Sequence, residues 1–353
     1  MLELRSADGA FERIEEYLRE RGFFSVGGER LVADLYLGYG LSEPLRRRRD
    51  VTAPPEPCPA LPLGAVAVRG AAPLVLNHHK LPAIGPWERS WTDADYAAAV
   101  EAVRDAIGRG DVYQVNLVQH LEAVSETSPR RLRGALAAFR PRLLEGDGWA
   151  VVSASPELFL SRRGRLVRTC PIKGTRPLGE HVEGAKDAAE HVMIVDLERN
   201  DLSRVCEPGS VRWPELMAER AMAGVTHLVS TVEGTLREGV GLAELLAATF
   251  PGGSVTGAPK LAALDLIAEL EPVGRGASMG ALGTVRGNGD LDLALTIRTF
   301  ALAEGRLHLW VGGGIVWDSD PEAEIEESWT KARPLLAPLG GLVLNHHKVG
   351  SAR

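Results

Sequence analysis

Two pairs of acidic residues have the spacing of carboxylates that share one face of a helix. Asp187 and Glu190 lie three residues apart in one predicted helix, and Glu324 and Glu327 have the same spacing in another. Like charges at this spacing destabilise a helix slightly unless something neutralises them. A hard cation such as Mg²⁺, which prefers carboxylate and water oxygens, would do so. Two solvated acidic faces are the alternative interpretation.

A short basic segment, Arg168 to Pro177, follows a predicted strand. Its prolines restrict φ and Gly174 permits a tight bend, so the segment would hold Lys173 and Arg176 close together. Burial and a neighbouring cation both lower the pKa of a lysine, which predicts a depressed pKa and a nucleophilic amine for Lys173. An ordinary basic turn on the surface is the alternative.

A glycine-rich loop, Phe250 to Lys260, precedes a predicted helix. Thr256 can cap that helix and Pro259 fits its first turn. Free backbone N–H groups and the helix dipole would then favour an anion. Ala258 and Pro259 stand where a phosphate-binding Walker loop needs Lys and Ser or Thr, so a carboxylate is the expected guest and a nucleotide is not.

Three consecutive glycines, Gly312 to Gly314, end a predicted strand. Such a triplet is typical of a close backbone approach to a ligand, although a β-bulge would explain it equally well. Arg298 lies in the neighbouring strand and could bind a carboxylate with both guanidinium nitrogens. It could also be an edge-strand charge.

The elements that must position these residues follow from hydrophobic periodicity and capping signals, including N-caps at Thr92 and Asp320. We predict helices at 11–20, 93–109, 129–139, 183–199, 242–249, 259–270 and 321–336. We predict strands at 111–121, 149–154, 158–162, 165–169, 225–236, 291–301 and 306–311. Strands in adjacent pairs with helices between the groups favour an α+β fold over a doubly wound parallel sheet.

Composition narrows the class of protein. The 353 residues are 45% hydrophobic and 25% charged, an ordinary globular balance. The net charge of -7 gives no basic footprint for nucleic acid. We find no apolar run of membrane-spanning length and no secretory leader, so we expect no membrane association. Cys58, Cys170 and Cys206 are odd in number and widely spaced, which favours free thiols and a cytoplasmic location.

One heptapeptide occurs twice without a physical explanation. The sequence Leu-Val-Leu-Asn-His-His-Lys stands at 74–80 and again at 342–348. Two distant copies are too few for a repeat fold. Adjacent histidines point in different directions on a helix or a strand, so we do not predict a metal site there.

Residues 85–337 resemble the chorismate-utilising enzyme family. The resemblance rests on long motifs, which are 110–117, 155–160, 168–177, 190–202, 227–231, 250–260 and 312–327. It implies an α+β fold in which two packed, mainly antiparallel β-sheets are surrounded by helices. It further implies that the chain binds chorismate, a dicarboxylate, together with Mg²⁺.

The resemblance also implies roles for individual residues. Glu190, Glu324 and Glu327 would bind Mg²⁺, with Asp187 nearby through water. Glu157 would be the general acid for the departing C4 hydroxyl of chorismate. The substrate would be held by His227, Gly253, Thr256, Arg298, Gly313, Gly314 and Lys331.

Two positions select among the activities of the family. Members that use water resemble one another in having a lysine base where Gln114 stands, so glutamine resembles the members that use ammonia. Members that form anthranilate have alanine where Lys173 stands. Lysine resembles the members in which this amine adds to C2 as the C4 hydroxyl leaves, after which ammonia attacks C4. The resemblance therefore implies 4-amino-4-deoxychorismate as the product, with anthranilate formation or a non-catalytic chorismate-binding subunit as alternatives.

The resemblance divides the chain into a shortened, divergent N-terminal region at 1–84, a catalytic domain at 85–337 and a tail at 338–353. None of the three cysteines lies in a Gly-x-Cys-x-Gly elbow, so we expect no fused glutaminase. A separate glutamine amidotransferase subunit is the expected partner. Thr284 departs from the family pattern, which usually has tyrosine at that position.

Overall fold

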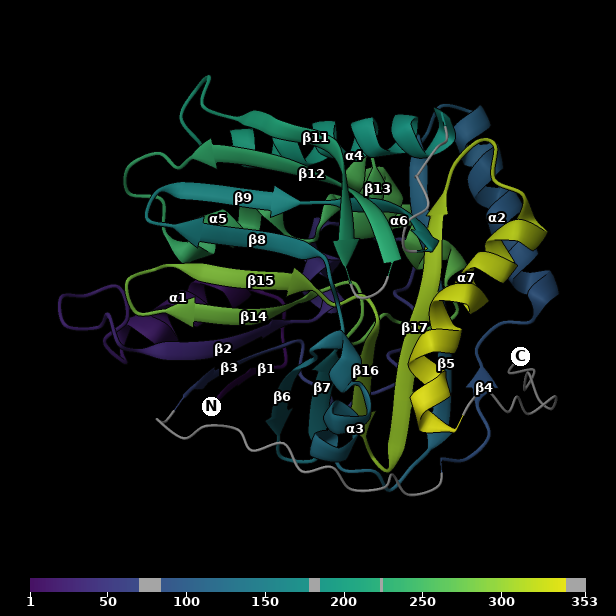
Figure 1. Ribbon diagram of the computed structural model, residues 1–353, viewed down its shortest axis with the longest axis horizontal. Coiled ribbons are helices and arrows are strands. Elements are labelled where there is room, and N and C mark those ends of the chain that lie inside the picture. The colour runs from purple at the N-terminus through teal and green to yellow at the C-terminus, as the bar shows by residue number, and fades with distance from the viewer. Residues whose placement is uncertain (70–83, 178–184, 223–224, 341–353) are drawn as a thin grey trace.

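Two antiparallel β-sheets organise the protein. The computed structural model describes residues 1–69, 84–177, 185–222 and 225–340. Every strand pairing in these residues is antiparallel, and helices cover the outer faces of the sheets (Figure 1). This arrangement confirms the predicted α+β fold with two packed sheets. No helix in these ranges is long and apolar enough to cross a membrane.

The larger sheet has the strand order β1-β3-β2-β14-β15-β8-β9-β12-β10, and β11 pairs with β12. Its strands are β1 (Leu2–Leu4), β2 (Val32–Leu37), β3 (Gly64–Val68), β8 (Leu158–Arg163), β9 (Leu166–Cys170), β10 (Ile172–Pro177), β11 (Arg212–Met222), β12 (Val225–Thr235), β14 (Ala281–Arg286) and β15 (Leu291–Leu295). The N-terminal strands thus extend the same sheet that contains the Lys173 segment.

The smaller sheet has the order β13-β5-β17-β16-β7-β6, and β4 pairs with β5. Its strands are β4 (Glu88–Arg89), β5 (Gln114–Val124), β6 (Arg142–Gly146), β7 (Trp149–Ser153), β13 (Gly257–Ala258), β16 (Thr299–Ala303) and β17 (Arg306–Ile315). The helices are α1 (Ala10–Arg19), α2 (Asp93–Gly108), α3 (Pro129–Ala135), α4 (Ala185–Ser203), α5 (Leu242–Thr249), α6 (Lys260–Leu270) and α7 (Pro321–Leu336).

Capping explains where two of these helices begin. Thr92 and Asp95 form a reciprocal capping box at the start of α2, and Asp320 accepts a hydrogen bond from the Ala323 N–H at the start of α7. Both caps confirm the sequence prediction. Each satisfies backbone donors that the helix leaves unpaired, an effect worth about 1 kcal/mol.

The predicted strand at 291–301 is wrong as a single element. The chain leaves the larger sheet after β15 and enters the smaller sheet at β16, so the two halves pair with different partners. Arg298 lies at this transition with φ 51°. A left-handed residue cannot continue an extended strand, and the apolar pattern on both sides concealed the break.

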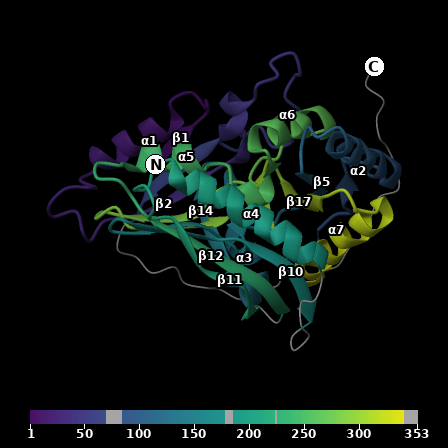
Figure 2. The same cartoon turned by 90° about the horizontal axis from the view of Figure 1, so that it is seen from above.

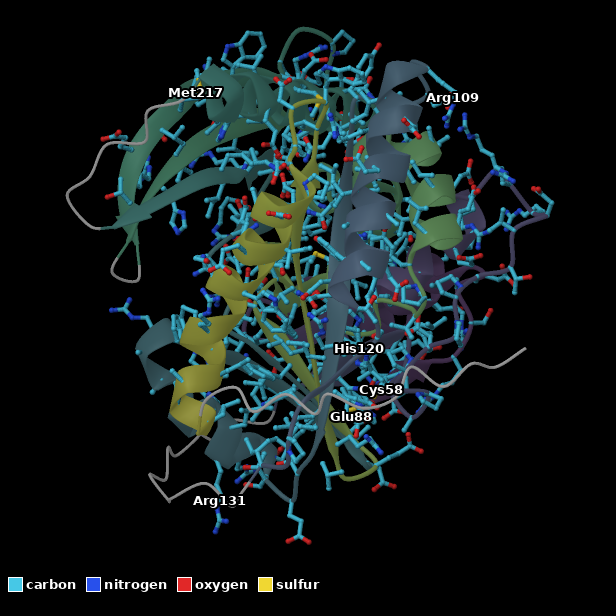
Figure 3. The ribbon with its side chains drawn as sticks, turned by 90° about the vertical axis from the view of Figure 1, so that its right-hand side faces the viewer. Cys58, Glu88, Arg109, His120, Arg131 and Met217 are labelled. Carbon is cyan, nitrogen blue, oxygen red and sulfur yellow. The ribbon has the colours of Figure 1, made fainter. Side chains whose placement is uncertain are left out.

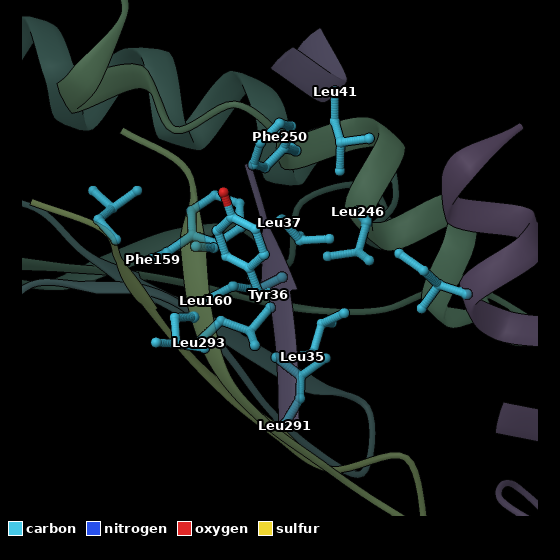
Figure 4. Close-up of a cluster of buried hydrophobic side chains, with 14 of the residues drawn as sticks. Leu35, Tyr36, Leu37, Leu41, Phe159, Leu160, Leu246, Phe250, Leu291 and Leu293 are labelled. Carbon is cyan, nitrogen blue, oxygen red and sulfur yellow. The ribbon is translucent and has the colours of Figure 1, made fainter. Parts of the chain in front are cut away.

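The hydrophobic core lies between the sheets and under the helices. Figure 4 shows part of it, in which Leu37 of β2 lies near Leu246 of α5. Seen from above, α1, α5 and α4 cover one face of the larger sheet (Figure 2). Burying each such side chain contributes about 1.5–3 kcal/mol to the free energy of unfolding. The packed sheets therefore hold the side chains at their edges in fixed positions. The three cysteines are free thiols, as predicted.

Candidate active site

Lys173 lies on β10, beside a β-bulge. The register between β10 and β12 shifts between Lys173 and Thr175, and the intervening Gly174 has φ 58°. The Gly174 carbonyl oxygen is 3.1 Å from Nδ1 of His227 on β12. A bulge with a left-handed glycine re-aims the neighbouring side chain. The Lys173 amine thereby comes within 2.5 Å of Glu190 Oε1 on α4.

The pKa of Lys173 is raised above its ordinary value, which contradicts the expected depression. Burial alone would lower this pKa, but the charge of Glu190, its hydrogen bond, and the charges of Glu157 and Glu327 outweigh burial. The sequence prediction considered burial and a neighbouring cation, and it did not include the carboxylates that the fold brings to the amine. The Arg176 side chain lies outside the described part of the structure.

Glu157 is a buried carboxyl group beside the amine. Its Oε1 accepts hydrogen bonds from Ser254 Oγ at 2.7 Å and from the Ile172 N–H at 3.4 Å. Burial raises the pKa of Glu157 above its ordinary value, and the Ser254 hydrogen bond and the Lys173 charge only partly oppose the rise. A raised pKa favours the protonated form, which is the form that a general acid needs.

Arg298 lies close enough to influence two of these groups. Its charge opposes the raised pKa of Glu157 and adds to the lowering of the His227 pKa, which burial dominates. The left-handed backbone at Arg298 directs this side chain from the junction of the two sheets. The structure therefore gathers Lys173, Glu157, His227 and Arg298, residues that lie far apart in the sequence.

Gln114 is the first residue of β5 and is fully buried. Neither polar atom of its side-chain amide has a hydrogen-bond partner among the described residues. A buried, unpaired amide costs about 1–3 kcal/mol, so such groups are usually satisfied by a ligand or by water. The Gln114 amide is thus free to bind a small polar molecule.

The glycine triplet forms the end of β17, and its missing side chains leave room for several functional groups. A Cβ atom at Gly314 would lie 2.1 Å from Gln114 Nε2 and 2.6 Å from Glu190 Oε1. A Cβ atom at Gly313 would lie 3.3 Å from Glu324 Oε2 and 3.3 Å from Glu327 Oε1. Glycine at both positions therefore permits β5, α4 and α7 to direct polar groups to one place.

The predicted metal ligands fit a hard cation by their chemistry, since they offer only carboxylate oxygens. Glu190, Glu324 and Glu327 each have a polar partner within the protein. Glu190 pairs with Lys173, Glu324 accepts from Ser319 Oγ at 2.6 Å, and Glu327 lies 2.7 Å from Lys331 Nζ. Lys331 also donates to the Gly312 carbonyl at 2.9 Å. The Asp187 side chain lies outside the described part of the structure.

Thr256 does not cap α6, contrary to the sequence prediction. Pro259 occupies the N-cap position, and the Thr256 hydroxyl donates to the Gly252 carbonyl at 2.9 Å. The reason is β13, which follows Thr256 and pairs with β5 before the helix begins. The loop around Gly253 packs against α4, where an added Cβ would lie 2.7 Å from Leu197 Cδ2.

Two buried polar groups near the site were missed from the sequence. Ser254 was treated only as part of a loop, although it binds Glu157 directly. Glu198 on α4 accepts a hydrogen bond from Thr169 Oγ1 at 2.7 Å, and burial raises its pKa to about 8. Glu198 lies eight residues after Glu190, about 80° further around the helix and still within the width of one helix face, and that spacing was the available signal. Both copies of the repeated heptapeptide lie outside the described residues.

Comparisons with known proteins give consistent matches. A family model described as chorismate binding enzyme matches residues 59–337. The chain is 41% identical over 293 residues to anthranilate synthase component 1 of Streptomyces coelicolor, covering 76% of this chain and 57% of the relative. It is 40% identical over 269 residues to aminodeoxychorismate synthase component 1 of Salmonella typhimurium, covering 72% and 59%. The chain thus spans less than two thirds of the length of these relatives.

One solved structure has the same fold over most of its length. The crystal structure of anthranilate synthase component I from Streptococcus pneumoniae TIGR4 matches with a TM-score of 0.75 at 27% sequence identity. The match covers 86% of this chain and 80% of that chain.

Proposed function

Because the chain belongs to the chorismate-binding enzyme family, we propose that it aminates chorismate at C4 to give 4-amino-4-deoxychorismate. The single observation that carries this proposal is the lysine at position 173, buried between two acidic groups. Relatives of similar identity are named for aminodeoxychorismate and for anthranilate synthesis. We choose between them on the nucleophile, since an amine in this place can form a covalent intermediate.

The reaction would proceed in two displacements. The neutral Lys173 amine adds to C2 of chorismate, the two conjugated ring double bonds shift toward C4, and the C4 hydroxyl leaves as water with a proton from Glu157; the second displacement reverses both shifts. Ammonia then attacks C4 and the bond between Lys173 and C2 breaks, which restores the double bonds and the free lysine. Dividing one hard displacement into two easier ones is the general advantage of covalent catalysis.

The remaining residues would bind and orient. Arg298 would pair with a substrate carboxylate, His227 would pack against the ring, and Gln114 would offer its unpaired amide to ammonia or substrate. Mg²⁺ bound by Glu190, Glu324 and Glu327 would hold the ring carboxylate and neutralise carboxylates that raise the pKa of Lys173. We further propose that ammonia comes from a glutamine amidotransferase subunit, in keeping with the relatives' designation as component 1.

Product analysis tests the proposed function. The protein is incubated with chorismate, Mg²⁺ and ammonium, and the product is identified by mass spectrometry with and without an aminodeoxychorismate lyase. We expect an aminated product that retains its pyruvate until the lyase is added. Fluorescent anthranilate formed without the lyase would instead establish the rival activity, and binding of chorismate without turnover would establish a non-catalytic subunit.

A further inference from the structure

A second cluster of titratable side chains lies on the smaller sheet. His120 and Glu122 of β5 and His308 of β17 each offer one ligand atom, and these atoms all lie within 4.8 Å of one another. His120 Nε2 is 3.0 Å from His308 Nδ1, which is 3.6 Å from Glu122 Oε2. Within the described ranges, no other trio of His, Cys, Asp or Glu side chains meets this distance limit. The predicted Mg²⁺ ligands Glu190, Glu324 and Glu327 do not meet it either.

Strand register explains how the three side chains meet. Glu122 lies directly opposite His308, and His120 lies opposite Trp310, in the antiparallel pair of β5 and β17. Residues two apart on a strand share a face, so both histidines and Glu122 project from one side of the sheet. Trp310 belongs to the core between the sheets, which identifies this side as the inner one. The histidines are accordingly buried, whereas Glu122 is half-buried.

The cluster is separate from the candidate active site. His120 lies six positions after Gln114 on β5, about 20 Å along an extended strand. Figure 3 shows His120 and Glu88 near one end of the strand, remote from Arg109, which precedes its other end.

The hydrogen bonds around His120 determine which ring nitrogen carries the lone pair that could bind a metal ion. Ser90 Oγ lies 3.0 Å from His120 Nδ1 and 3.2 Å from the His120 carbonyl oxygen. The hydroxyl has one proton, which the carbonyl accepts, so its oxygen accepts from Nδ1–H and Nε2 carries a lone pair. A histidine that ligates a metal characteristically donates its other N–H to such a partner. In the ion-free protein, His308 Nδ1–H donates to this lone pair at 3.0 Å. Ligation therefore requires that His308 carry its proton on Nε2 instead, so that both nitrogens face the ion with lone pairs.

Two neighbouring charges act on Glu122 in opposite directions. Glu88 lies directly opposite Glu122 on β4, and like charges at such a cross-strand position repel. Arg306 donates to Glu122 Oε1 at 3.1 Å, which leaves Oε2 on the side of His308. Burial lowers the pKa of both histidines, to about 4 for His308, so both rings are neutral near pH 7, as metal ligation requires.

We propose that His120, Glu122 and His308 form a binding site for a transition-metal ion of the Zn²⁺ class. Zn²⁺ prefers imidazole and carboxylate ligands in a tetrahedron, whereas Mg²⁺ prefers oxygen alone. Bonds of about 2.1 Å in a tetrahedron place ligand atoms about 3.4 Å apart. The separations of 3.0 and 3.6 Å lie on either side of that value, and the third, between His120 and Glu122, is at most 4.8 Å, so the side chains would have to adjust around the ion. The fourth position is left for water or another small ligand.

Titration of the full-length, chelator-treated protein with Zn²⁺, followed by calorimetry, tests this site. We expect one ion per chain and a rise in Tm, because a ligand that binds only the folded state stabilises it. Co²⁺ in place of Zn²⁺ should give the visible absorption of a four-coordinate nitrogen and oxygen site. A tenfold excess of Mg²⁺ should not displace either ion.

Variants locate the binding. His308→Ala should weaken Zn²⁺ binding at least about 100-fold and Glu122→Gln about 10-fold, in the range seen when metal-site partners are removed. Glu327→Gln, which removes a carboxylate outside the cluster, in the candidate active site, should bind Zn²⁺ as tightly as the wild type. If His308→Ala does not fold, the Zn²⁺ affinity of Glu122→Gln tests the site instead, because Glu122 is only half-buried. Absence of saturable binding at one ion per chain, or unchanged affinity in the folded cluster variants, would overturn the proposal.

Discussion

Lys173 Nζ lies 2.5 Å from Glu190 Oε1, so the proposed nucleophile is held by a proposed metal ligand. This ion pair keeps the amine protonated, and a protonated amine cannot attack carbon. Activation of Lys173 therefore requires that Glu190 be neutralised or drawn away. Because of this contact, a cation that binds at the carboxylates should lower the pKa of the amine and increase its reactivity.

Chemical labelling of Lys173 should accordingly depend on Mg²⁺. We expect acetic anhydride at pH 8 to modify Lys173 slowly without the cation and several-fold faster with it, because neutralising Glu190 lowers the lysine pKa. Lys260 is a matched control, since it forms an equally short buried pair with Asp201 at 2.5 Å. Peptide mass spectrometry measures both sites. Equal reactivity of Lys173 in the two conditions would contradict the proposed linkage.

Ser254→Ala should shift the pH dependence of turnover. The Ser254 hydroxyl lowers the pKa of Glu157, so its removal should raise that pKa further. A general acid acts while protonated, and the alkaline limb of kcat/KM should therefore move to higher pH. Ser155→Ala is the control. In the described part of the structure, Ser155 Oγ accepts a hydrogen bond from the Glu157 backbone N–H and not from the Glu157 carboxyl group. A limb that stays in place, or moves to lower pH, would exclude Glu157 as the acid.

Adding one methyl group at the end of β17 should have graded effects. The methyl group in Gly314→Ala would lie 2.1 Å from Gln114 Nε2, and we expect about a 100-fold loss of kcat/KM, since displacements of about 1 Å cost that much. Gly313→Ala meets Glu324 and Glu327 only at 3.3 Å and should mainly raise the Mg²⁺ concentration required. Steady-state kinetics at varied Mg²⁺ distinguish the two. Wild-type kinetics in Gly314→Ala would show that this strand end does not contact the reaction.

Glu198 should make stability depend on pH. Its pKa is about 8 in the folded protein and near 4.5 when unfolded, so the folded state binds more protons between those values. The free energy of unfolding should therefore fall as pH rises through this window, by at most about 1.4 kcal/mol per pH unit. Urea denaturation should show a flatter profile for Glu198→Gln, while the exposed Glu238→Gln keeps the wild-type slope. Parallel profiles for all three proteins would contradict a buried, protonated Glu198.

Much of the fold could be predicted from local signals. The caps at Thr92 and Asp320 and the helical periodicities each depend on nearby residues, and the structure confirms them. The break at Arg298 could not be predicted, because the choice of sheet depends on partners distant in the sequence. The same holds for Thr256, whose capping role is lost when β13 pairs with β5.

The candidate site was predictable in its residue types but not in its electrostatics. Motif spacing suggested the acids and the lysine, and the structure brings Glu190 of α4 into contact with Lys173. The sign of the Lys173 pKa shift depends on distances between elements that the sequence does not state. The partnership of Ser254 with Glu157 is likewise a tertiary contact between segments 97 residues apart.

The most direct test of the central claim omits ammonia. The protein is mixed with chorismate and Mg²⁺ alone, quenched, and examined by intact and peptide mass spectrometry. We predict an adduct equal to chorismate less one water, located on the peptide that contains Lys173 and absent from Lys173→Ala. Unmodified Lys173 in a preparation that makes the C4-aminated product once ammonium is added, or an active Lys173→Ala with the same product, would contradict the account.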